Sequence, residues 1–173
     1  MAVLIQVVDE LGVTVSEIEK MAAHENGGVW HRAISVFLFD SAGRVLIQKR
    51  AKGKYHFAGL WANSCCSHPT VIESPLESAL RAMRTELGLY TGISEVGIVR
   101  YEAHDPITGH TEREHDHIFS GTVTEVAKPN PEEVEEIRWL ELDALRSEID
   151  HQPKDFAPWL SVILQSNLIV VPN

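Results

Sequence analysis

The chain has 173 residues, 44% of them hydrophobic, and a formal net charge of −10 at pH 7. That length suits one compact domain with a core, so we expect a single domain over residues 1–173. An acidic chain disfavours nucleic-acid binding, which needs clustered Lys and Arg. No apolar run approaches the roughly 20 residues of a membrane helix, and the segment MAVLIQVVDE has neither a basic n-region nor a small-residue cleavage site. We therefore expect a soluble, cytoplasmic protein with no nucleic-acid or membrane partner. Its oligomeric state is not predicted.

The first third of the chain contains predicted strands. Residues 1–8 are typical of a strand, whereas residues 16–23 are typical of a turn or one helical turn. The apolar run AISVFLF at 33–39, the turn residues at 41–43 and a second apolar run at 45–48 predict a hairpin.

A basic segment follows this hairpin. Lys49, Arg50, Lys52 and Lys54 form the densest positive segment of the chain. It can be a solvated loop, or it can supply the local basic pocket that an anionic substrate needs in an acidic protein.

The two cysteines, Cys65 and Cys66, are neighbours in the segment NSCCSHP at 63–69. Their Cα atoms lie about 3.8 Å apart, closer than the roughly 4.4 Å minimum of ordinary disulfides. We expect free thiols, either packed as small hydrophobic groups or with one used chemically. The polar surroundings of Cys66 just before a helix predict a lowered thiol pKa that suits proton transfer.

The strongest helix signal covers residues 74–88, SPLESALRAMRTELG. Ser74 and Glu77 have the spacing of a capping box, and Gly88 suits the C-terminal stop. Helical periodicity predicts a buried apolar stripe: Leu76, Ala79, Leu80, Met83 and Leu87. Glu86 lies beside this stripe, so we expect a partly buried carboxylate that requires a cation.

The second half of the chain mixes strands and helices. Strands are predicted around 96–103, 112–124 and 137–140, and helices at 142–149 and 158–165. Strands before, between and after helices indicate an α+β domain or a mixed sheet between helical layers.

Period-two alternation in EREHDHIF places Glu112 and Glu114 on one face of their strand. Three histidines, His24, His31 and His68, lie outside any clear apolar stripe. Three imidazoles and one or two carboxylates can form a site for Zn, Mn, Fe or a Mg-like ion. The spacing of the histidines matches no known metal-binding helix signature.

The span from Ser67 to Leu89 resembles the Nudix box, Gly-x5-Glu-x7-Arg-Glu-apolar-x-Glu-Glu-x-Gly-apolar. The matching positions are Ser67, Glu73, Arg81, Ala82, Met83, Thr85, Glu86, Gly88 and Leu89. Ser67, Ala82 and Thr85 depart from the pattern. Ala82 and Thr85 replace two of the glutamates with which Nudix hydrolases gather the metals that activate water, so hydrolysis is handicapped.

The same box preceded by NSCCSHP is similar to type I isopentenyl diphosphate isomerases, which share the Nudix fold but move a proton instead of cleaving a phosphate. Most of the chain follows the family's order of segments: EKMAAH (19–24), His31, RA (50–51), GLWANSCCSHP (59–69), the helix, the Tyr101 strand, ERE (112–114) and FAPW (156–159). The resemblance implies an α+β fold, with a Nudix-like mixed β-sheet sandwiched between helices in a single compact domain.

The resemblance also implies catalytic and metal-binding roles. Cys66 matches the catalytic thiol, and Glu114 matches the acid/base carboxylate on the opposite side of the substrate. A divalent metal, Zn²⁺ or Mn²⁺, has five matched ligands: His24, His31, His68, Glu112 and Glu114. Glu86 matches the carboxylate that helps to hold Mg²⁺ on the diphosphate.

A small-molecule diphosphate is the implied partner. Lys20, Arg50 and Lys54 match its cationic contacts, and Tyr101 and Trp159 match pocket aromatics. Ala82 stands where a further basic residue is expected. Either Arg81 or Arg84 substitutes for it, or the site has one cation fewer.

The implied reaction, in isoprenoid biosynthesis, interconverts isopentenyl and dimethylallyl diphosphate through a tertiary carbocation. We expect Glu114, polarised by metal and by Tyr101, to add a proton and Cys66 to remove one, although the sequence leaves the direction open. The face of Trp159 would stabilise the cation by about 2 kcal/mol when desolvated. The pocket must also exclude water.

Two other functions remain open. The box also allows a Nudix diphosphohydrolase acting on a nucleotide or prenyl diphosphate, and the His and Glu cluster alone allows a non-catalytic metal- or diphosphate-binding module. The apolar C-terminal segment NLIVVPN, residues 167–173, can be a closing strand, a pocket lid or a dimer contact.

Overall fold

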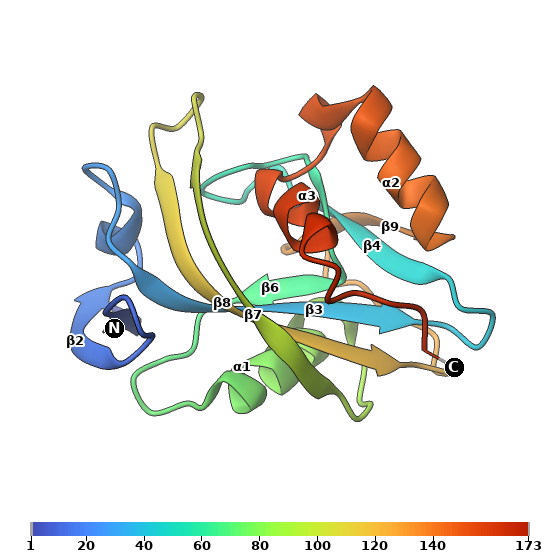
Figure 1. The fold of residues 1–173 in the computed structure, drawn as a ribbon, viewed down its shortest axis with the longest axis horizontal. Coiled ribbons are helices and arrows are strands. Elements are labelled where there is room, and N and C mark those ends of the chain that lie inside the picture. Colours follow the sequence, from blue (N-terminus) through green and yellow to red (C-terminus); the bar gives the residue numbers. More distant parts are fainter. Residues whose placement is uncertain (1, 173) are drawn as a thin grey trace.

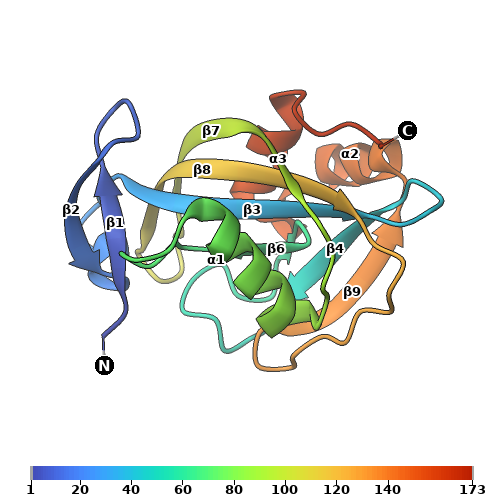
Figure 2. The same cartoon turned by 90° about the horizontal axis from the view of Figure 1, so that it is seen from below.

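The computed structural model describes residues 2–172. Within them, one curled sheet of nine strands has helices on both of its faces (Figures 1 and 2). Strand β3 (His31–Phe39) runs through its middle, with β8 (Thr111–Thr122) parallel beside it and β7 (Ser94–His104) antiparallel to β8. Parallel and antiparallel pairs therefore coexist. The predicted α+β fold, a mixed sheet between helices, is confirmed.

The remaining strands extend this sheet on both sides of β3. Counted along the chain, the first two strands form an antiparallel hairpin. The fourth strand pairs with the ninth and with the fifth, and the sixth strand pairs with β3. Their bounds are β1 Leu4–Val8, β2 Thr14–Glu19, β4 Val45–Arg50, β5 Trp61–Ala62, β6 Cys65–Ser67 and β9 Val134–Leu140.

Two helical layers enclose the sheet. Helix α1 (Pro75–Ala82) covers one face, and α2 (Leu142–His151) and α3 (Pro158–Gln165) cover the other (Figure 2). Successive side chains of β3 point to opposite faces of the sheet, so the strand contributes to both cores. Val36 packs in the core under α1, whereas Phe37 packs in the core under α2 and α3. Two 3₁₀ turns complete the helical elements: η1 Ala22–His24 and η3 Pro153–Asp155.

The predicted helix over 74–88 is present in two parts. The capping box is confirmed, because Ser74 Oγ accepts from the Glu77 N–H at 3.3 Å and Glu77 Oε2 accepts from the Ser74 N–H at 2.8 Å. After α1 the chain continues as one π-helical turn, η2 (Met83–Leu87), and stops at Gly88, whose φ is 64°. The change to i→i+5 bonding was not predicted.

The placement of Leu76 in the buried stripe is wrong, because its side chain is 43% exposed. Small residues face the sheet instead: Ser78, Ala79 and Ala82 are almost fully buried. Their size lets the helix approach the strands closely and turns the larger Leu76 outward.

One strand prediction needs correction, and the predicted hairpin at 33–48 is present but short. Residues 16–19 belong to β2 rather than to a turn, and only 22–24 form the expected helical turn. Strand β2 is short, polar and mostly exposed, which is typical of an edge strand without an apolar face. The hairpin of β3 and β4 has a single paired position, Phe39↔Val45, because β4 turns away to pair with β9. Met1, included in the first predicted strand, lies outside the described residues.

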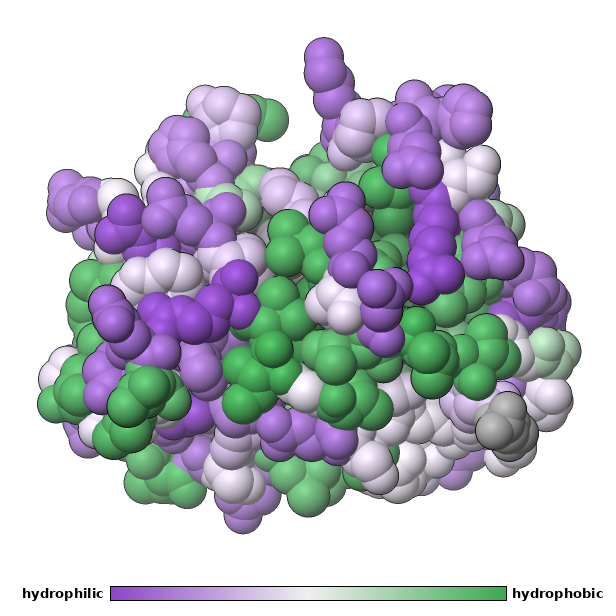
Figure 3. All heavy atoms as spheres, viewed as in Figure 1, coloured by the Kyte–Doolittle hydropathy of each residue, from purple (hydrophilic) through white to green (hydrophobic). Residues whose placement is uncertain are grey.

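The C-terminal segment forms no strand up to residue 172, and it is anchored by the buried Ile169. Figure 3 shows apolar residues gathered near the centre of one face. Among the exposed apolar side chains are Val96 and Ile98 of β7 and Val162 of α3. None of these three lines the main pocket. Among residues 2–172 there is no helix whose length and apolarity would allow it to cross a bilayer.

Candidate active site and metal-binding cluster

A small pocket, about 30 Å³ in volume, lies where β6, β7 and β8 meet the N-terminus of α3 and the loop after β4. It brings together residues that are far apart in the chain. Among its lining residues are many of those predicted for the site: Lys20, Arg50, Lys54, Cys66, His68, Tyr101, Glu112, Glu114 and Trp159. His24 and His31 do not line it but contact Glu112, at 3.0 and 3.7 Å. The predicted residues therefore converge on one site, apart from Glu86.

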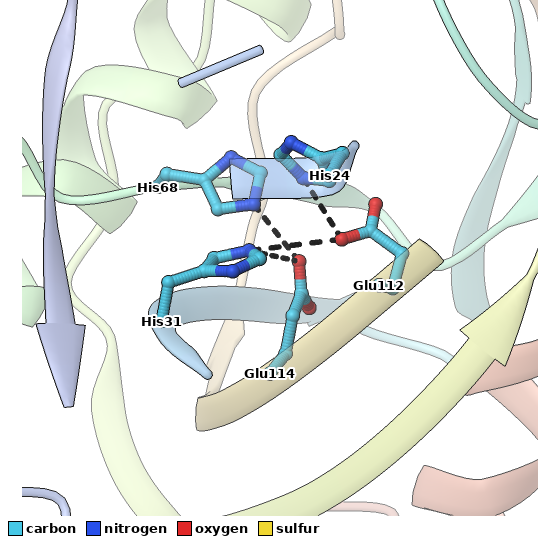
Figure 4. A group of neighbouring side chains, drawn as sticks. All are labelled: His24, His31, His68, Glu112 and Glu114. Carbon is cyan, nitrogen blue, oxygen red and sulfur yellow. Dashed lines mark hydrogen bonds and ion pairs between the residues drawn. The ribbon is translucent and has the colours of Figure 1, made fainter. Parts of the chain in front are cut away.

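Five buried side chains form a compact cluster beside the pocket (Figure 4). One ligand atom from each lies within 4.8 Å of all the others; the five are His24, His31, His68, Glu112 and Glu114. The parallel register of β3 and β8 places His31 opposite Glu114, and period-two alternation directs Glu112 to the same face. This is the five-residue set predicted from the sequence.

Hydrogen bonds fix how the histidines face the carboxylates. The ring atoms His24 Nδ1 and His31 Nδ1 lie 2.6 Å and 2.7 Å from the backbone carbonyls of Lys20 and Val29. A carbonyl only accepts, so each Nδ1 carries the proton and each Nε2 presents a lone pair to the cluster.

The cluster contains buried acceptors that face one another. Among residues 2–172, His24 Nε2, His31 Nε2 and Glu112 Oε2 have no hydrogen-bond partner. Converging buried lone pairs are costly unless a cation lies between them. Imidazole nitrogen and carboxylate oxygen are suitable ligands for a divalent ion, so the cluster fits one.

The two carboxylates of the cluster differ electrostatically. Burial, followed by the charge of Glu114, raises the pKa of Glu112 well above its usual range. Burial alone would raise the pKa of Glu114 too, but the nearby His31 ring, 3.6 Å away, and the hydrogen bond from His68 at 2.9 Å outweigh it and hold that pKa well below the usual range. Burial lowers the pKa of His68 to about 3. Glu114 is therefore a carboxylate, and His68 beside it is neutral.

Cys66 lines the pocket from β6, whereas its neighbour Cys65 is fully buried in the α1 core. Both thiols are free, as predicted. The prediction of a lowered pKa for Cys66 is wrong, because burial raises it. The residue lies in a strand, not at a helix N-terminus, so no helix dipole offsets that burial.

Asn63 fixes the thiol of Cys66 and was missed by the sequence analysis. Its Oδ1 accepts from Cys66 Sγ at 3.1 Å and from Trp159 Nε1 at 3.0 Å. Its Nδ2 donates to the backbone carbonyls of Val36 and Cys65, which fixes the orientation of the amide. The first residue of NSCCSHP, a buried amide next to the cysteines, was the available signal.

Aromatic side chains form another part of the pocket wall. The Tyr101 hydroxyl donates to Glu114 Oε2. The rings of Tyr101 and Trp159 are stacked, with centroids 6.4 Å apart and an interplanar angle of 25°. Both are more than nine-tenths buried. This part of the wall is therefore largely shielded from solvent and lined by aromatic rings.

The basic segment after β4 is divided between the pocket and solvent. Arg50 is buried and lies 5.3 Å from the Trp159 ring centroid, and Lys54 lines the pocket and pairs with Glu133. Lys52 is exposed. Burial, followed by the charge of Lys54, lowers the pKa of Lys20, which completes the set of pocket cations. The pocket therefore has local positive charge within an acidic protein.

Glu86 does not line this pocket. It projects from η2 and accepts from Gln48 Nε2 at 2.8 Å. Burial raises its pKa to about 7. The expectation of a buried carboxylate is confirmed, and its hydrogen-bond partner is the Gln48 amide rather than a cation.

Neither arginine near Ala82 takes the place of a pocket cation. Arg81 is bound to Glu73 through Nε at 2.6 Å and through a second guanidinium nitrogen at 2.9 Å, and Arg84 is exposed. Neither lines the pocket, so its cations come from Lys20, Arg50 and Lys54.

Tyr55 and His56 also line the pocket and were not predicted. His56 hydrogen-bonds Glu112, and its ring stacks on Tyr55 with centroids 4.1 Å apart. Their position between the basic segment and the GLW motif was the only signal in the sequence.

The fold is that of Nudix proteins, and the buried His and Glu cluster lies beside a pocket with cationic side chains. The NUDIX domain family model matches residues 29–160, so the chain belongs to the Nudix superfamily. A crystal structure of a Deinococcus radiodurans protein superposes with a TM-score of 0.79 at 18% identity, covering 94% of this chain and 98% of that one. A MutT protein from Methanosarcina mazei gives 0.65 at 16% identity, covering 79% and 91%.

Curated relatives place the chain more narrowly. It is 43% identical over 166 residues to a protein of Streptomyces griseus, covering 95% of this chain and 83% of the relative. It is 42% identical over 161 residues to one of Nocardia farcinica, covering 93% and 92%. Both are named isopentenyl-diphosphate Delta-isomerase. The chain belongs to the isopentenyl-diphosphate Delta-isomerase family.

Proposed function

We propose that the protein interconverts isopentenyl diphosphate and dimethylallyl diphosphate, as a step of isoprenoid biosynthesis. The observation that carries this proposal is a pocket that contains a thiol, Cys66, and a carboxylate, Glu114, together with aromatic rings and cations. Moving the double bond requires one group that donates a proton and another that accepts one. Family membership supports the same reaction.

The surroundings of Cys66 and Glu114 favour a protonated thiol and an ionised carboxylate before the substrate binds. Burial raises the pKa of the Cys66 thiol, which keeps its proton, whereas Glu114 stays a carboxylate that accepts from Tyr101. In this state Cys66 gives a proton to the terminal methylene of isopentenyl diphosphate, and Glu114 accepts one from the methylene next to the diphosphate-bearing carbon. This direction is the reverse of the one expected from the sequence.

The other pocket residues bind and protect the substrate. Lys20, Arg50 and Lys54 bind the diphosphate, and the face of Trp159 stabilises the tertiary carbocation, an effect of about 2 kcal/mol when desolvated. The buried aromatic wall excludes water, which would trap the cation as an alcohol.

Two divalent ions belong to this proposal. A Zn²⁺ or Mn²⁺ ion held by the five-residue cluster would keep Glu114 ionised and oriented, and Mg²⁺ carried by the diphosphate would neutralise substrate charge. Glu86 is the residue proposed to help hold Mg²⁺. The unpartnered, buried nitrogens of His24 and His31 support the first site.

NMR in deuterated water tests the reaction. The protein is incubated with isopentenyl diphosphate, Mg²⁺ and Mn²⁺ or Zn²⁺, and the isomerase produces dimethylallyl diphosphate with deuterium in a methyl group. Release of phosphate or pyrophosphate would instead identify a diphosphohydrolase. Binding without proton exchange would identify a non-catalytic module.

Partial exchange tests the direction of proton transfer. If Cys66 is the donor, Glu114→Gln still introduces deuterium slowly into the terminal methylene of isopentenyl diphosphate, because protonation can reverse, whereas Cys66→Ala does not. The opposite pattern would assign the donor role to Glu114.

A further inference from the structure

His56 lies between the proposed diphosphate site and the proposed metal site, and it is not one of the five cluster residues. Its Nε2 hydrogen-bonds Glu112 Oε1. On the other side of the ring, its Nδ1 lies 3.3 Å from a terminal guanidinium nitrogen of Arg50. One buried imidazole therefore contacts both a substrate-binding cation and a metal-binding carboxylate.

These two neighbours determine which ring nitrogen carries the proton. The guanidinium of Arg50 only donates, so His56 Nδ1 must accept. A neutral imidazole carries one ring proton, so with Nδ1 accepting, the proton is on Nε2, which faces Glu112. His56 is therefore the neutral Nε2–H tautomer, and it donates to Oε1 of Glu112. The second oxygen, Oε2, remains to face His24 and His31.

The ring of His56 is held on several sides. It is 3% exposed and stacks on Tyr55 with an interplanar angle of 7°. Arg50 binds the His56 carbonyl at 3.1 Å, and Asp105 Oδ2 accepts from the N–H of the next residue, Phe57, at 2.9 Å. Phe57 has a φ of 47°, an uncommon conformation that these bonds hold in place. The position of the Nε2–H is therefore fixed before any ligand binds.

We propose that His56 is a positioning residue of the metal site, which orients Glu112 by donating to Oε1 so that Oε2 is directed into the cluster. This inference rests on the proposed metal site. A carboxylate that rotates freely loses part of its affinity for an ion, because its orientation must be fixed on binding. Through its contact with Arg50, His56 also helps to orient that guanidinium at the proposed diphosphate site.

Two amide substitutions separate the two hydrogen bonds of the ring. The amide of Gln reaches the position of Nε2 and can donate to Glu112, whereas the shorter Asn reaches only the position of Nδ1. Mn²⁺ affinity is measured without substrate, from the electron paramagnetic resonance signal of free Mn²⁺ in titrations of the purified protein. His151→Asn, an exposed change on α2, is the matched control.

We expect His56→Asn and His56→Ala to weaken Mn²⁺ binding by about 10–100-fold, and His56→Gln and His151→Asn to retain wild-type affinity. Excess Mn²⁺ restores most of the turnover of His56→Asn, because its effect is on metal occupancy. Thermal melts confirm that each variant folds.

Different outcomes overturn the two proposals. If wild-type protein binds Mn²⁺ and His56→Asn binds it equally well, His56 does not position Glu112, while the metal site stands. Equal losses in His56→Gln and His56→Asn would also reject the Nε2–H donor. If wild-type protein binds neither Mn²⁺ nor Zn²⁺, the metal site itself is wrong, and the inference is rejected with it.

Discussion

Asn63 anchors two groups of the proposed reaction centre through one carbonyl oxygen. Its carbonyl oxygen accepts from both the Cys66 thiol and the Trp159 indole, so the proposed proton carrier and the proposed cation-stabilising ring share an anchor. Two donors on one acceptor keep both groups at fixed positions next to the pocket. A shift in either one would leave a buried donor unpaired, which costs about 1–3 kcal/mol.

Substitution of the two proton carriers should abolish isomerisation. Cys66→Ala removes the thiol, and Glu114→Gln removes the carboxylate but preserves its shape. We expect each variant to lose interconversion, measured by NMR, with an unchanged circular dichroism spectrum. Near-normal turnover by either variant would contradict its assignment.

Cys65→Ser is the control for the thiol. Cys65 is buried in the α1 core and does not line the pocket, so we expect only a modest loss of activity through packing. Complete loss would mean that the wrong cysteine was assigned.

Glu86 should give the metal-free protein a distinctive pH dependence. Burial raises its pKa to about 7, so the folded state holds its proton more tightly than the unfolded state above about pH 4.5. Its contribution to stability is therefore present below the unfolded pKa and is lost as the pH rises toward 7. We expect the loss to be about 3 kcal/mol and to be absent in Glu86→Gln.

Urea unfolding in the presence of EDTA, between pH 4.5 and pH 8, measures this effect as the difference between wild type and Glu86→Gln. Glu132→Gln, an exposed change, is the control and should follow the wild type. Parallel curves for wild type and Glu86→Gln would show that Glu86 ionises normally.

Local patterns predicted some residue properties and not others. The shared face of Glu112 and Glu114 follows from strand alternation, which is a local rule, and the structure confirms it. The raised pKa of Cys66 could not be predicted, because it depends on burial by Trp159 and other residues that are distant in sequence. Tertiary burial outweighed the polar character of the local segment.

The π-helical turn η2 is the element that brings Glu86 inward. It follows α1 without a break, and Glu86 and Leu87 are both buried, so an acidic and an apolar side chain share the inner side of one turn. Wide turns of this kind are frequent at functional sites. The sequence predicted the helix and its two ends from caps, but it contained no signal for the change in hydrogen bonding.

Arg81 ties α1 to the loop before it, and its removal should destabilise the protein. Its hydrogen bonds, offset in part by burial, lower the pKa of Glu73 to about 2. We expect Arg81→Met to lower the free energy of unfolding at pH 7 by about 2 kcal/mol. A depressed pKa stabilises above the unfolded value, so the difference from wild type shrinks as the pH falls from about 4.5 toward 2.

Urea unfolding at several pH values measures this difference. Arg84→Met, on the exposed side of η2, is the matched control and should change stability by less than about 0.5 kcal/mol. A difference between Arg81→Met and wild type that does not vary with pH would mean that packing rather than the ion pair is responsible.

The elements themselves were predictable where an apolar face exists. Strands β3, β7 and β8 and helices α2 and α3 follow from apolar runs and periodicity. Strand β2 was missed because it is exposed and polar, and the pairing of β4 with β9 was not predicted because it depends on the whole sheet. Edge strands and distant pairings carry little local signal.

At the scale of the whole molecule, metal binding should be coupled to stability. The cluster joins η1, β3, β8 and the segment after β6, so an ion there crosslinks distant parts of the chain. An ion at 100 times its dissociation constant adds about 2.7 kcal/mol. For a chain of this size we expect removal of the metal to lower Tm by about 5–10 °C.

Differential scanning calorimetry before and after EDTA treatment measures this shift, and added Mn²⁺ or Zn²⁺ should reverse it. Glu112→Gln, which alters the cluster, should show a much smaller shift. An unchanged Tm after verified metal removal would contradict the coupling.

The parallel pairing of β3 with β8 also determines when the cluster can form during folding. His31 and Glu114 meet only after a long loop has closed, and such distant pairing is slow. We expect the ion to bind after this pairing, so that it slows unfolding more than it speeds folding. In a cell short of the metal, the protein would fold at the usual rate but would be degraded sooner by proteolysis. Its abundance would therefore fall as the concentration of available metal falls.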